Sequence, residues 1–359
     1  MSFHRLLSVA LLLAIGCSLK PPASETLSSL PTSVPAPADN PTRPEAVELG
    51  RALFWDPILS GNRDVACATC HHPSFGYTDG LAVSVGVGGR GVGSARAAGP
   101  GARVARNSMS VLGAAFNGLT VDGAARPEAA PMFWDHRTAS LEAQALGPIK
   151  NELEMRGNAF REDEILDELV ARLSGIPEYV ARFRAAFGAE GVTATTLAKA
   201  IAAFERTLVP SPTSFDRYMA GDDGAMTASQ IRGMHGFIAQ GCARCHSGPM
   251  LSDFKLHRLP VRESGAPDLG DGTGQFRTPS LRMITLTAPY MHNGTVTTLD
   301  GTIDFYHNLE VTSPLLEGDV EPPLGGGDDL RAFYEALSDG TFDRTIPERV
   351  PSGLPPGGT

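Results

Sequence analysis

The sequence predicts a mainly α-helical protein built from two related halves. Apolar residues recur at helical spacing through the chain, while the alternating patterns typical of strands are scarce. A second observation is a repeated unit, in which a helix and a short loop lead into a Cys-x-x-Cys-His motif with a proline nearby. The unit occurs at residues 48–73 and again at 227–249. The 359 residues, 42% of them hydrophobic, are enough for two domains of ordinary size.

Residues 1–17 resemble a signal peptide. Arg5 gives a basic start, and the apolar run that ends at Gly16 and Cys17 is too short to span a bilayer. The small residues before Cys17 resemble a lipobox, whose cysteine is lipidated after cleavage; cleavage nearby that discards Cys17 is the alternative. We therefore expect a periplasmic protein, anchored to the outer membrane if Cys17 carries lipid.

The segments that flank the folded part have a different composition. Residues 18–44 are rich in Pro, Ser, Thr and Ala and offer few large apolar groups to bury, which predicts a flexible tether. The folded part is expected to begin near Glu45, where a helical pattern runs to Asp56 before Pro57. Residues 346–359 are rich in Pro and Gly and are expected to form a tail.

Between these limits the chain divides near residue 210. The glycine-rich stretch at 83–107 is expected to be a surface loop, because its spacing does not match a phosphate-binding turn between strand and helix. The segment "VPSPTS" at 209–214 interrupts the helical pattern, so we predict one domain over 45–210 and a second over 211–345. Helical patterns are found within 163–173, 178–187, 195–208, 227–240 and 328–337.

Charge and cysteine content exclude some functions. The formal net charge is −10, so the chain lacks the basic surface that nucleic-acid binding requires, and proteins or small molecules are the expected partners. Exported proteins usually place cysteines in disulfides. Here four of the five cysteines fall in two Cys-x-x-Cys pairs, each followed at once by histidine, which leaves none for a disulfide framework.

The two motifs, "CATCH" at 67–71 and "CARCH" at 242–246, indicate covalent haem attachment. In such motifs the thiols add to the haem vinyl groups and the histidine binds the iron. A zinc site or a pair of redox-active dithiols is the alternative, but neither needs a histidine directly after both pairs. We therefore predict two c-type haems, held by Cys67, Cys70 and His71 and by Cys242, Cys245 and His246.

The first haem has no obvious second axial ligand. None of the nine histidines lies between residues 73 and 135, and His72 adjoins the proximal ligand too closely to reach the opposite face. Met109 and Met132 remain candidates, although nothing in their context marks them as ligands. A haem with one vacant position can bind and split a small oxidant, whereas a haem with both positions filled carries electrons.

The chain resembles the bacterial di-haem cytochrome c peroxidases and, more closely, their relative MauG. The resemblance implies two cytochrome c-like domains whose haem sites face a shared domain interface. It covers about residues 45–345 and is carried by "ELGRALFWDPILSGNRDVACATCHHP", "RNSMSVLGAAFN", "MFWDHRTASLEAQALGPIKNELEM", "AIAAFERTL", "GCARCHSGP" and "FRTPSLRMITLTAPYMHNGTVTTLDGTIDFYHN", in this order.

The resemblance also implies roles for three residues near the first haem. Trp134 would lie between the haems and relay electrons, while Gln144 and Glu154 would line the pocket where peroxide binds. A buried carboxyl with a raised pKa can move a proton from the near to the far oxygen of peroxide. Without the resemblance, Trp134 would be a core residue, and Glu154 or its neighbour Glu152 an exposed helix acid. The family pattern Leu-Glu-Met selects Glu154.

Classical members of this family cap the first iron with a loop histidine until the second haem is reduced. The matching region here, residues 83–93, contains no histidine, which predicts a first haem that is open when fully oxidised, as in MauG. For the second haem the resemblance implies Tyr306 as the sixth ligand, and a phenolate stabilises oxidised iron. The alternatives are a core tyrosine, with Met291, Met283 or His307 as the ligand.

A calcium ion between the domains is also implied by the resemblance. Asn107 would supply its side chain, and Thr287 and Pro289 their backbone carbonyls, with water completing an oxygen shell. The same comparison implies that His136 and His292 form structural hydrogen bonds and do not bind metal.

The predicted function is that of an exported di-haem peroxidase. It would reduce hydrogen peroxide with electrons from a donor protein, such as a small cytochrome or a cupredoxin. One alternative is a MauG-type enzyme that oxidises residues of a partner protein. A second is a di-haem electron carrier without enzymatic activity, in which both irons would have six ligands.

Overall fold

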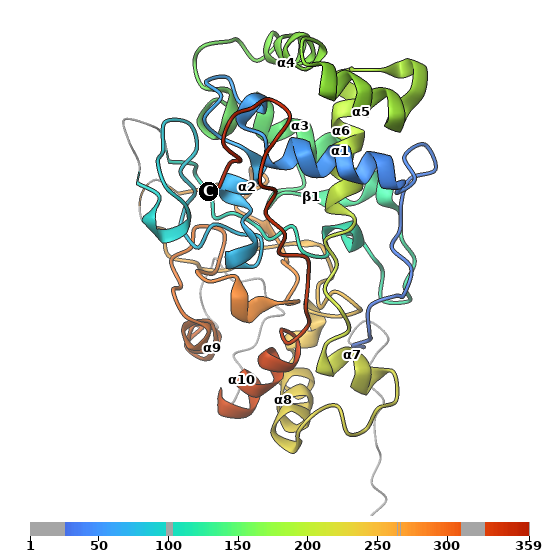
Figure 1. Cartoon of the computed structure of the whole chain (residues 1–359). Helices are drawn as coiled ribbons and strands as arrows, with labels where there is room; N and C mark the ends of the chain where they lie inside the picture. Colours follow the sequence, from blue (N-terminus) through green and yellow to red (C-terminus); the bar gives the residue numbers. More distant parts are fainter. Residues whose placement is uncertain (1–25, 98–102, 264, 266, 310–326, 359) are drawn as a thin grey trace, which may run out of the picture.

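In the computed structural model the described residues are 26–97, 103–263, 265, 267–309 and 327–358. They form a mainly helical molecule with two bundles, one above the other in Figure 1. The expected signal peptide, 1–17, and Cys17 with its expected lipid lie outside the described residues. Within the described part, no helix combines the length and apolar character needed to cross a membrane.

The N-terminal bundle forms around one apolar core. Leu53 of the first helix, Ile149, Phe183 and Leu197 are all fully buried in this core, in agreement with the apolar faces that the sequence shows. Thr193 starts the last helix, because its hydroxyl accepts a hydrogen bond from the Thr196 amide at 3.1 Å. The helices are α1 (Pro44–Trp55), α2 (Cys67–Cys70), α3 (Leu141–Lys150), α4 (Ile165–Ser174), α5 (Pro177–Phe187) and α6 (Ala194–Glu205).

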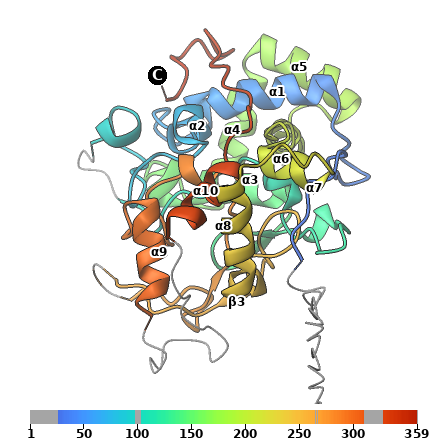
Figure 2. The same cartoon turned by 90° about the horizontal axis from the view of Figure 1, so that it is seen from below.

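The C-terminal bundle has its own core, in which Phe215, Phe237 and Phe333 pack together. Thr227 and Gln230 form a reciprocal cap at the start of α8, where the Gln230 side chain accepts from the Thr227 amide at 2.8 Å. Figure 2 shows α8 beside α10. The helices are α7 (Ser214–Met219), α8 (Ala228–Ala239), α9 (Leu299–His307) and α10 (Gly327–Ala336).

Both bundles contain the same close helix crossing. A Cβ atom at Gly50 of α1 would lie 1.9 Å from the carbonyl oxygen of Ala200 in α6. In the other bundle, a Cβ atom at Gly233 of α8 would lie 1.9 Å from the carbonyl oxygen of Asp329 in α10. In each pair of helices the backbones touch where only glycine fits. The repeated crossing supports the two related halves that the sequence predicts.

Short elements outside the bundles shape the region between them. The hairpin of β1 (Pro131–Met132) and β2 (Thr138–Ala139) belongs to the N-terminal half, and the antiparallel pair β3 (Leu256–His257) and β4 (Phe276–Arg277) to the other. A π-helical turn, η7 (Glu152–Arg156), follows α3. The 3₁₀ turns are η2 (Pro57–Leu59), η3 (Pro73–Phe75), η4 (Gly93–Ala95), η5 (Ala114–Phe116), η6 (Pro127–Ala129), η8 (Gly188–Glu190), η9 (Cys242–Arg244) and η10 (Ile284–Leu286).

Residues 26–43 are packed against both halves, whereas the composition of 18–44 predicts a flexible tether. Leu27 is 3% exposed and lies in the C-terminal core. Two buried arginines donate to backbone carbonyls of this segment, Arg282 to Ser28 at 3.1 Å and Arg206 to Asn40 at 3.0 Å. Composition measures how much apolar surface a segment can bury, but it does not reveal that backbone carbonyls satisfy arginines of the core.

The expected tail, 346–359, also packs on the protein in its described part. The chain leaves α10, runs back across both bundles and ends beside α2, as the dark red trace in Figure 1 shows. Ser352 donates to Asp56 at 2.6 Å, and the Gly357 amide donates to the Trp55 carbonyl at 2.7 Å. The C-terminal segment therefore completes the surface of the N-terminal half.

The glycine crossings lead to a prediction about stability. Gly50→Ala and Gly233→Ala should each lower the free energy of unfolding by about 1–3 kcal/mol, because the added methyl group meets rigid backbone. Chemical unfolding of the haem-loaded protein measures the change. Gly236→Ala in α8 is the matched control, since its Cβ would contact only the end of the Gln240 side chain at 3.7 Å. This variant should be as stable as the parent or slightly more so. If all three variants unfold alike, the close crossings do not explain the glycines.

Candidate haem sites

The first cavity gathers residues that are distant in sequence. Cys67 and Cys70 lie on α2 and His71 caps it, while Gln144 comes from α3 and Glu154 from the π-turn η7. All five line the same cavity. The structure therefore brings together the residues that the sequence predicts for the first haem.

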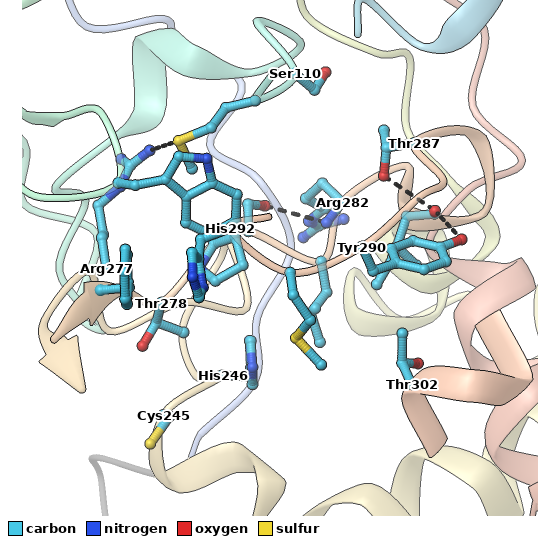
Figure 3. Close-up of a pocket in the computed structure, with 18 of the residues that line it drawn as sticks. Ser110, Cys245, His246, Arg277, Thr278, Arg282, Thr287, Tyr290, His292 and Thr302 are labelled. Carbon is cyan, nitrogen blue, oxygen red and sulfur yellow. Dashed lines mark hydrogen bonds between the residues drawn. The ribbon is translucent and has the colours of Figure 1, made fainter. Parts of the chain in front are cut away.

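The second cavity lies in the C-terminal half, and Figure 3 shows its interior. Cys242 and Cys245 line it together with His246, directly after the turn η9. Tyr306 of α9 lines the same cavity. The proximal and distal residues predicted for the second haem are thus also assembled around one space.

The two motif histidines are held in the same way. His71 Nδ1 lies 3.1 Å from the Tyr77 carbonyl oxygen, and His246 Nδ1 lies 2.9 Å from that of Leu251. A carbonyl can only accept, so Nδ1 carries the proton and Nε2 is the nitrogen that can bind iron. Burial lowers the pKa of both imidazoles and keeps them neutral. Both rings are in the form that an axial ligand requires.

The four motif cysteines are free and divided between the cavities. Burial raises the pKa of Cys70 and Cys242 to about 12 and about 11. A zinc site that uses all four is therefore not formed. Among the described residues, one compact group offers metal-binding atoms, namely Cys245, Asp253 and His257. A thioether bond from Cys245 to haem would remove the thiolate that such a site needs.

The acid predicted for peroxide chemistry faces the first cavity. Glu154 accepts a hydrogen bond from the Asn151 amide group at 2.9 Å. Burial raises the pKa of the Glu154 carboxyl, and the positive charge of Arg137 opposes this shift. Glu152, on the same turn, has a side chain that is 62% exposed and does not line the cavity. Of the two neighbouring acids, only Glu154 faces this cavity.

The glycine-rich loop supports this turn. A Cβ atom at Gly86 would lie 1.9 Å from the Leu153 carbonyl oxygen and 2.6 Å from that of Glu154. The buried guanidinium of Arg96 donates to the carbonyls of Val85 at 2.5 Å and Gly86 at 2.7 Å. The loop therefore packs against the turn that carries Glu154.

The first cavity contains no second histidine among its described lining residues. His72 is turned away, with its ring near Trp55. Met109 and Met132 do line the cavity, but each sulfur accepts a hydrogen bond, Met109 from Arg277 at 3.2 Å and Met132 from Asn117 at 3.3 Å. The two methionines that the sequence left as candidate ligands are thus engaged elsewhere.

The two cavities share a wall. Trp134 stands in this wall at the turn of the β1–β2 hairpin, and its indole donates to the Asn107 carbonyl at 3.0 Å. The Arg277 amide donates in turn to the Trp134 carbonyl at 2.7 Å, which ties the hairpin to β4 of the other half. Residues that line both cavities are Asn107, Ser108, Met109, Ser110, Asn117, Trp134 and Arg277.

Arg277 is a site residue that the sequence analysis did not single out. It is 5% exposed, and no described residue accepts a hydrogen bond from its Nε. Burial lowers its pKa to about 10, which still leaves it charged at neutral pH. A buried cation without a carboxylate partner can hold the acid group of a cofactor, such as a haem propionate. Nothing in the "FRTPSLR" segment of the sequence indicates that Arg277 is a site residue, because the burial of an arginine depends on the assembled fold.

The structure distinguishes between the residues considered as alternatives to Tyr306 for the sixth ligand of the second haem. Met291 lines the second cavity, as Tyr306 does. Met283 is fully buried in an apolar cluster, and His307 does not line either cavity. Burial, with the nearby thiols Cys242 and Cys245, raises the pKa of the Tyr306 hydroxyl. A bound metal ion would have to supply the charge that makes it a phenolate.

The three residues expected to hold calcium all line the second cavity, and Asn107 also belongs to the shared wall. The Asn107 side-chain amide donates to the Leu81 carbonyl at 2.8 Å, which leaves its Oδ1 to accept. Thr287 and Pro289 belong to one segment of the lining, and Figure 3 shows Thr287 near Tyr290. His292 also lines this cavity and is bound to Glu263 at 2.7 Å, as expected of a structural histidine. His136 lines neither cavity.

Comparison with known proteins agrees with this geometry. The family described as "Di-haem cytochrome c peroxidase" matches residues 44–224. The cytochrome-c peroxidase IdrP1 of Denitromonas iodatirespirans is 37% identical over 351 residues, which cover 85% of this chain and 84% of that protein. The methylamine utilization protein MauG of Methylorubrum extorquens is 36% identical over 333 residues, covering 89% and 85%.

A solved structure shows the same architecture. It is the crystal structure of a MauG-like protein associated with microbial copper homeostasis, which is 29% identical, has a TM-score of 0.71, and covers 86% of this chain and 94% of its own. With half the chain matched by the family and relatives above 30% identity over most of its length, the chain belongs to the di-haem cytochrome c peroxidase and MauG family.

Proposed function

We propose that this chain is an exported di-haem peroxidase that reduces hydrogen peroxide at the first haem. The observation that carries the proposal is the first cavity. It combines His71, whose Nδ1 is held by the Tyr77 carbonyl, with Glu154 and Gln144, and its described lining residues include no second histidine. Cys67 and Cys70 would hold this haem. The second would be held by Cys242, Cys245 and His246, with Tyr306 as its sixth ligand.

The side chains around the first cavity can carry the proton steps. Reduction of one hydrogen peroxide to two waters consumes two electrons and two protons. A haem iron held by His71 would supply the binding position for peroxide. Glu154 would accept a proton from the near oxygen and deliver it to the far one, which would leave as water when the O–O bond breaks, with the electrons coming from the donor. The Gln144 amide can orient the bound peroxide by hydrogen bonding. The raised pKa of Glu154 suits a group that must both take and give a proton.

Electrons would enter from a donor protein, a small cytochrome or a cupredoxin, and reach the first site through the second. Trp134 is the residue of the shared wall suited to relay them, because its aromatic ring borders both cavities. The Asn107 carbonyl and the Arg277 amide hold its indole and its backbone in place. A calcium ion on Asn107, Thr287 and Pro289 would stabilise the same wall.

A MauG-type activity is the second candidate. In that case the oxidising equivalents would be used to oxidise residues of a partner protein, and the same wall would carry the electrons. Tyr306 in the second cavity favours a MauG-type activity, because a phenolate ligand stabilises oxidised iron. A di-haem carrier without enzymatic activity would need a sixth ligand for the first iron. The described lining residues of the first cavity include no second histidine, and the sulfurs of Met109 and Met132 already accept hydrogen bonds.

The proposal is tested with the haem-loaded, fully oxidised protein. Peroxide or cyanide should change the Soret band immediately, since the first iron has a vacant position. With a reduced donor, each peroxide consumed should oxidise two equivalents of the donor. Stopped-flow absorbance measures both. A low-spin spectrum that ignores both reagents would contradict the peroxidase proposal and favour the electron carrier.

Glu154→Gln should lower kcat/KM for peroxide by about 100-fold to 10,000-fold, because the amide cannot shuttle the proton. Haem content and cyanide binding should stay unchanged. Glu152→Gln is the matched control, since this acid is on the same turn but points to solvent. Steady-state peroxidase assays compare the two variants. Equal activities would show that Glu154 has no special role.

Tyr306→Phe should open the second iron to added ligands, because phenylalanine cannot coordinate. Titration of the oxidised variant with cyanide should then show two binding events per protein, whereas the parent shows one. Met291→Leu is the control, as this residue lines the same cavity. If the second event appears in Met291→Leu and not in Tyr306→Phe, the ligand assignment is reversed.

A further inference from the structure

The first cavity contains a second buried acid, for which the proposed mechanism has no use. Glu205 is the last residue of α6 and is 4% exposed. It lines the first cavity together with Ile201, one helical turn earlier on the same face. No described residue donates a hydrogen bond to its buried Oε2. An unsatisfied buried carboxyl costs stability, so its presence calls for an explanation.

The neighbouring cations are paired with other groups and do not form an ion pair with this acid. Arg206 is adjacent in sequence, but its guanidinium is bound to Glu142 at 2.7 Å and to the Asn40 carbonyl at 3.0 Å. Arg51, from the helix packed against α6, is paired with Asp343 at 2.7 Å and lies over Phe204. The nearby Glu142 repels a second negative charge. No cation is therefore dedicated to Glu205 among the described residues.

The balance of these effects moves the titration of Glu205 close to neutral pH. Burial raises the pKa of Glu205 to about 8, the Glu142 charge adds to the shift, and Arg206 opposes it. The same carboxyl acts electrostatically on Cys67, a predicted haem anchor. Glu205 can thus exchange a proton near neutral pH, beside Cys67, the residue predicted to anchor the first haem. A change of charge in the cavity can tip such a group between its two states.

We infer that Glu205 binds a proton when the site in the first cavity is reduced and releases the proton when that site is oxidised. The inference rests on the proposed placement of a haem on Cys67, Cys70 and His71. When the donor protein delivers one electron to this site, the Glu205 carboxylate takes one proton from solvent and becomes the acid. When the electron leaves, the O–H bond breaks and the proton returns. The charge inside the cavity stays constant, which removes an electrostatic barrier to electron entry.

Redox titration at several pH values tests this inference. The midpoint potential of the first haem in the full-length, haem-loaded protein should fall with rising pH around neutrality. The limit is about 59 mV per pH unit, because a tenfold change in proton concentration corresponds to this value for one electron. Glu205→Gln should abolish the dependence. Glu190→Gln, at an exposed acid just before α6, should retain it, and so should Glu154→Gln. A dependence that survives in Glu205→Gln, or disappears in Glu154→Gln instead, overturns the inference.

A second measurement does not require a folded variant. The infrared difference spectrum between the oxidised and reduced parent protein should contain a carbonyl band of a protonated carboxylic acid, which grows on reduction. Its absence overturns the inference. Peroxide turnover in the same samples reports on the proposed function separately, since a protein without turnover can still show the proton-coupled potential, and an active enzyme can lack it.

Discussion

The shared wall between the two cavities is the constraint on which the rest of the structure depends. Trp134 is fixed in it at both ends, by its indole on the Asn107 carbonyl and by its own carbonyl on the Arg277 amide. The first contact lies within the N-terminal half and the second crosses to the other half. A shift of either half would break one of these bonds and separate the cavities. The electron path proposed through Trp134 is therefore tied to the packing of the halves.

Two ionisable side chains are buried in this region, and burying them lowers the stability of the fold. Among the described residues, Arg277 has no carboxylate partner and Glu205 has no cation of its own, although both are nearly inaccessible to solvent. In a low dielectric each such group acts strongly on any charge nearby. Arg277 provides a fixed positive charge between the cavities, whereas Glu205 can gain or lose its charge. The first is suited to hold the acid group of a cofactor, and the second is the group inferred to respond to electrons.

Sequence patterns predicted the elements that local chemistry determines. The helical patterns within 163–173 and 178–187 correspond to α4 and α5, and the motif histidines are held as axial ligands should be. What the patterns missed depends on distant contacts. Leu27 is buried because Arg282 binds the segment that carries it. From the sequence alone, Glu205 would be taken for an ordinary exposed helix acid. Its burial follows from the packing of α6 and cannot be predicted from the pattern of one helix.

The absence of a loop histidine is matched by the way the loop is built. Arg96 ties the loop to itself through three of its carbonyls, and Gly86 brings its backbone against the turn that carries Glu154. Any larger residue at Gly86 would push this turn away, because the contact is with backbone oxygen. A loop fixed in this way cannot swing a ligand toward the iron without breaking the hydrogen bonds of a buried guanidinium. The open first site that we propose and the position of Glu154 are thus both explained by the same packing.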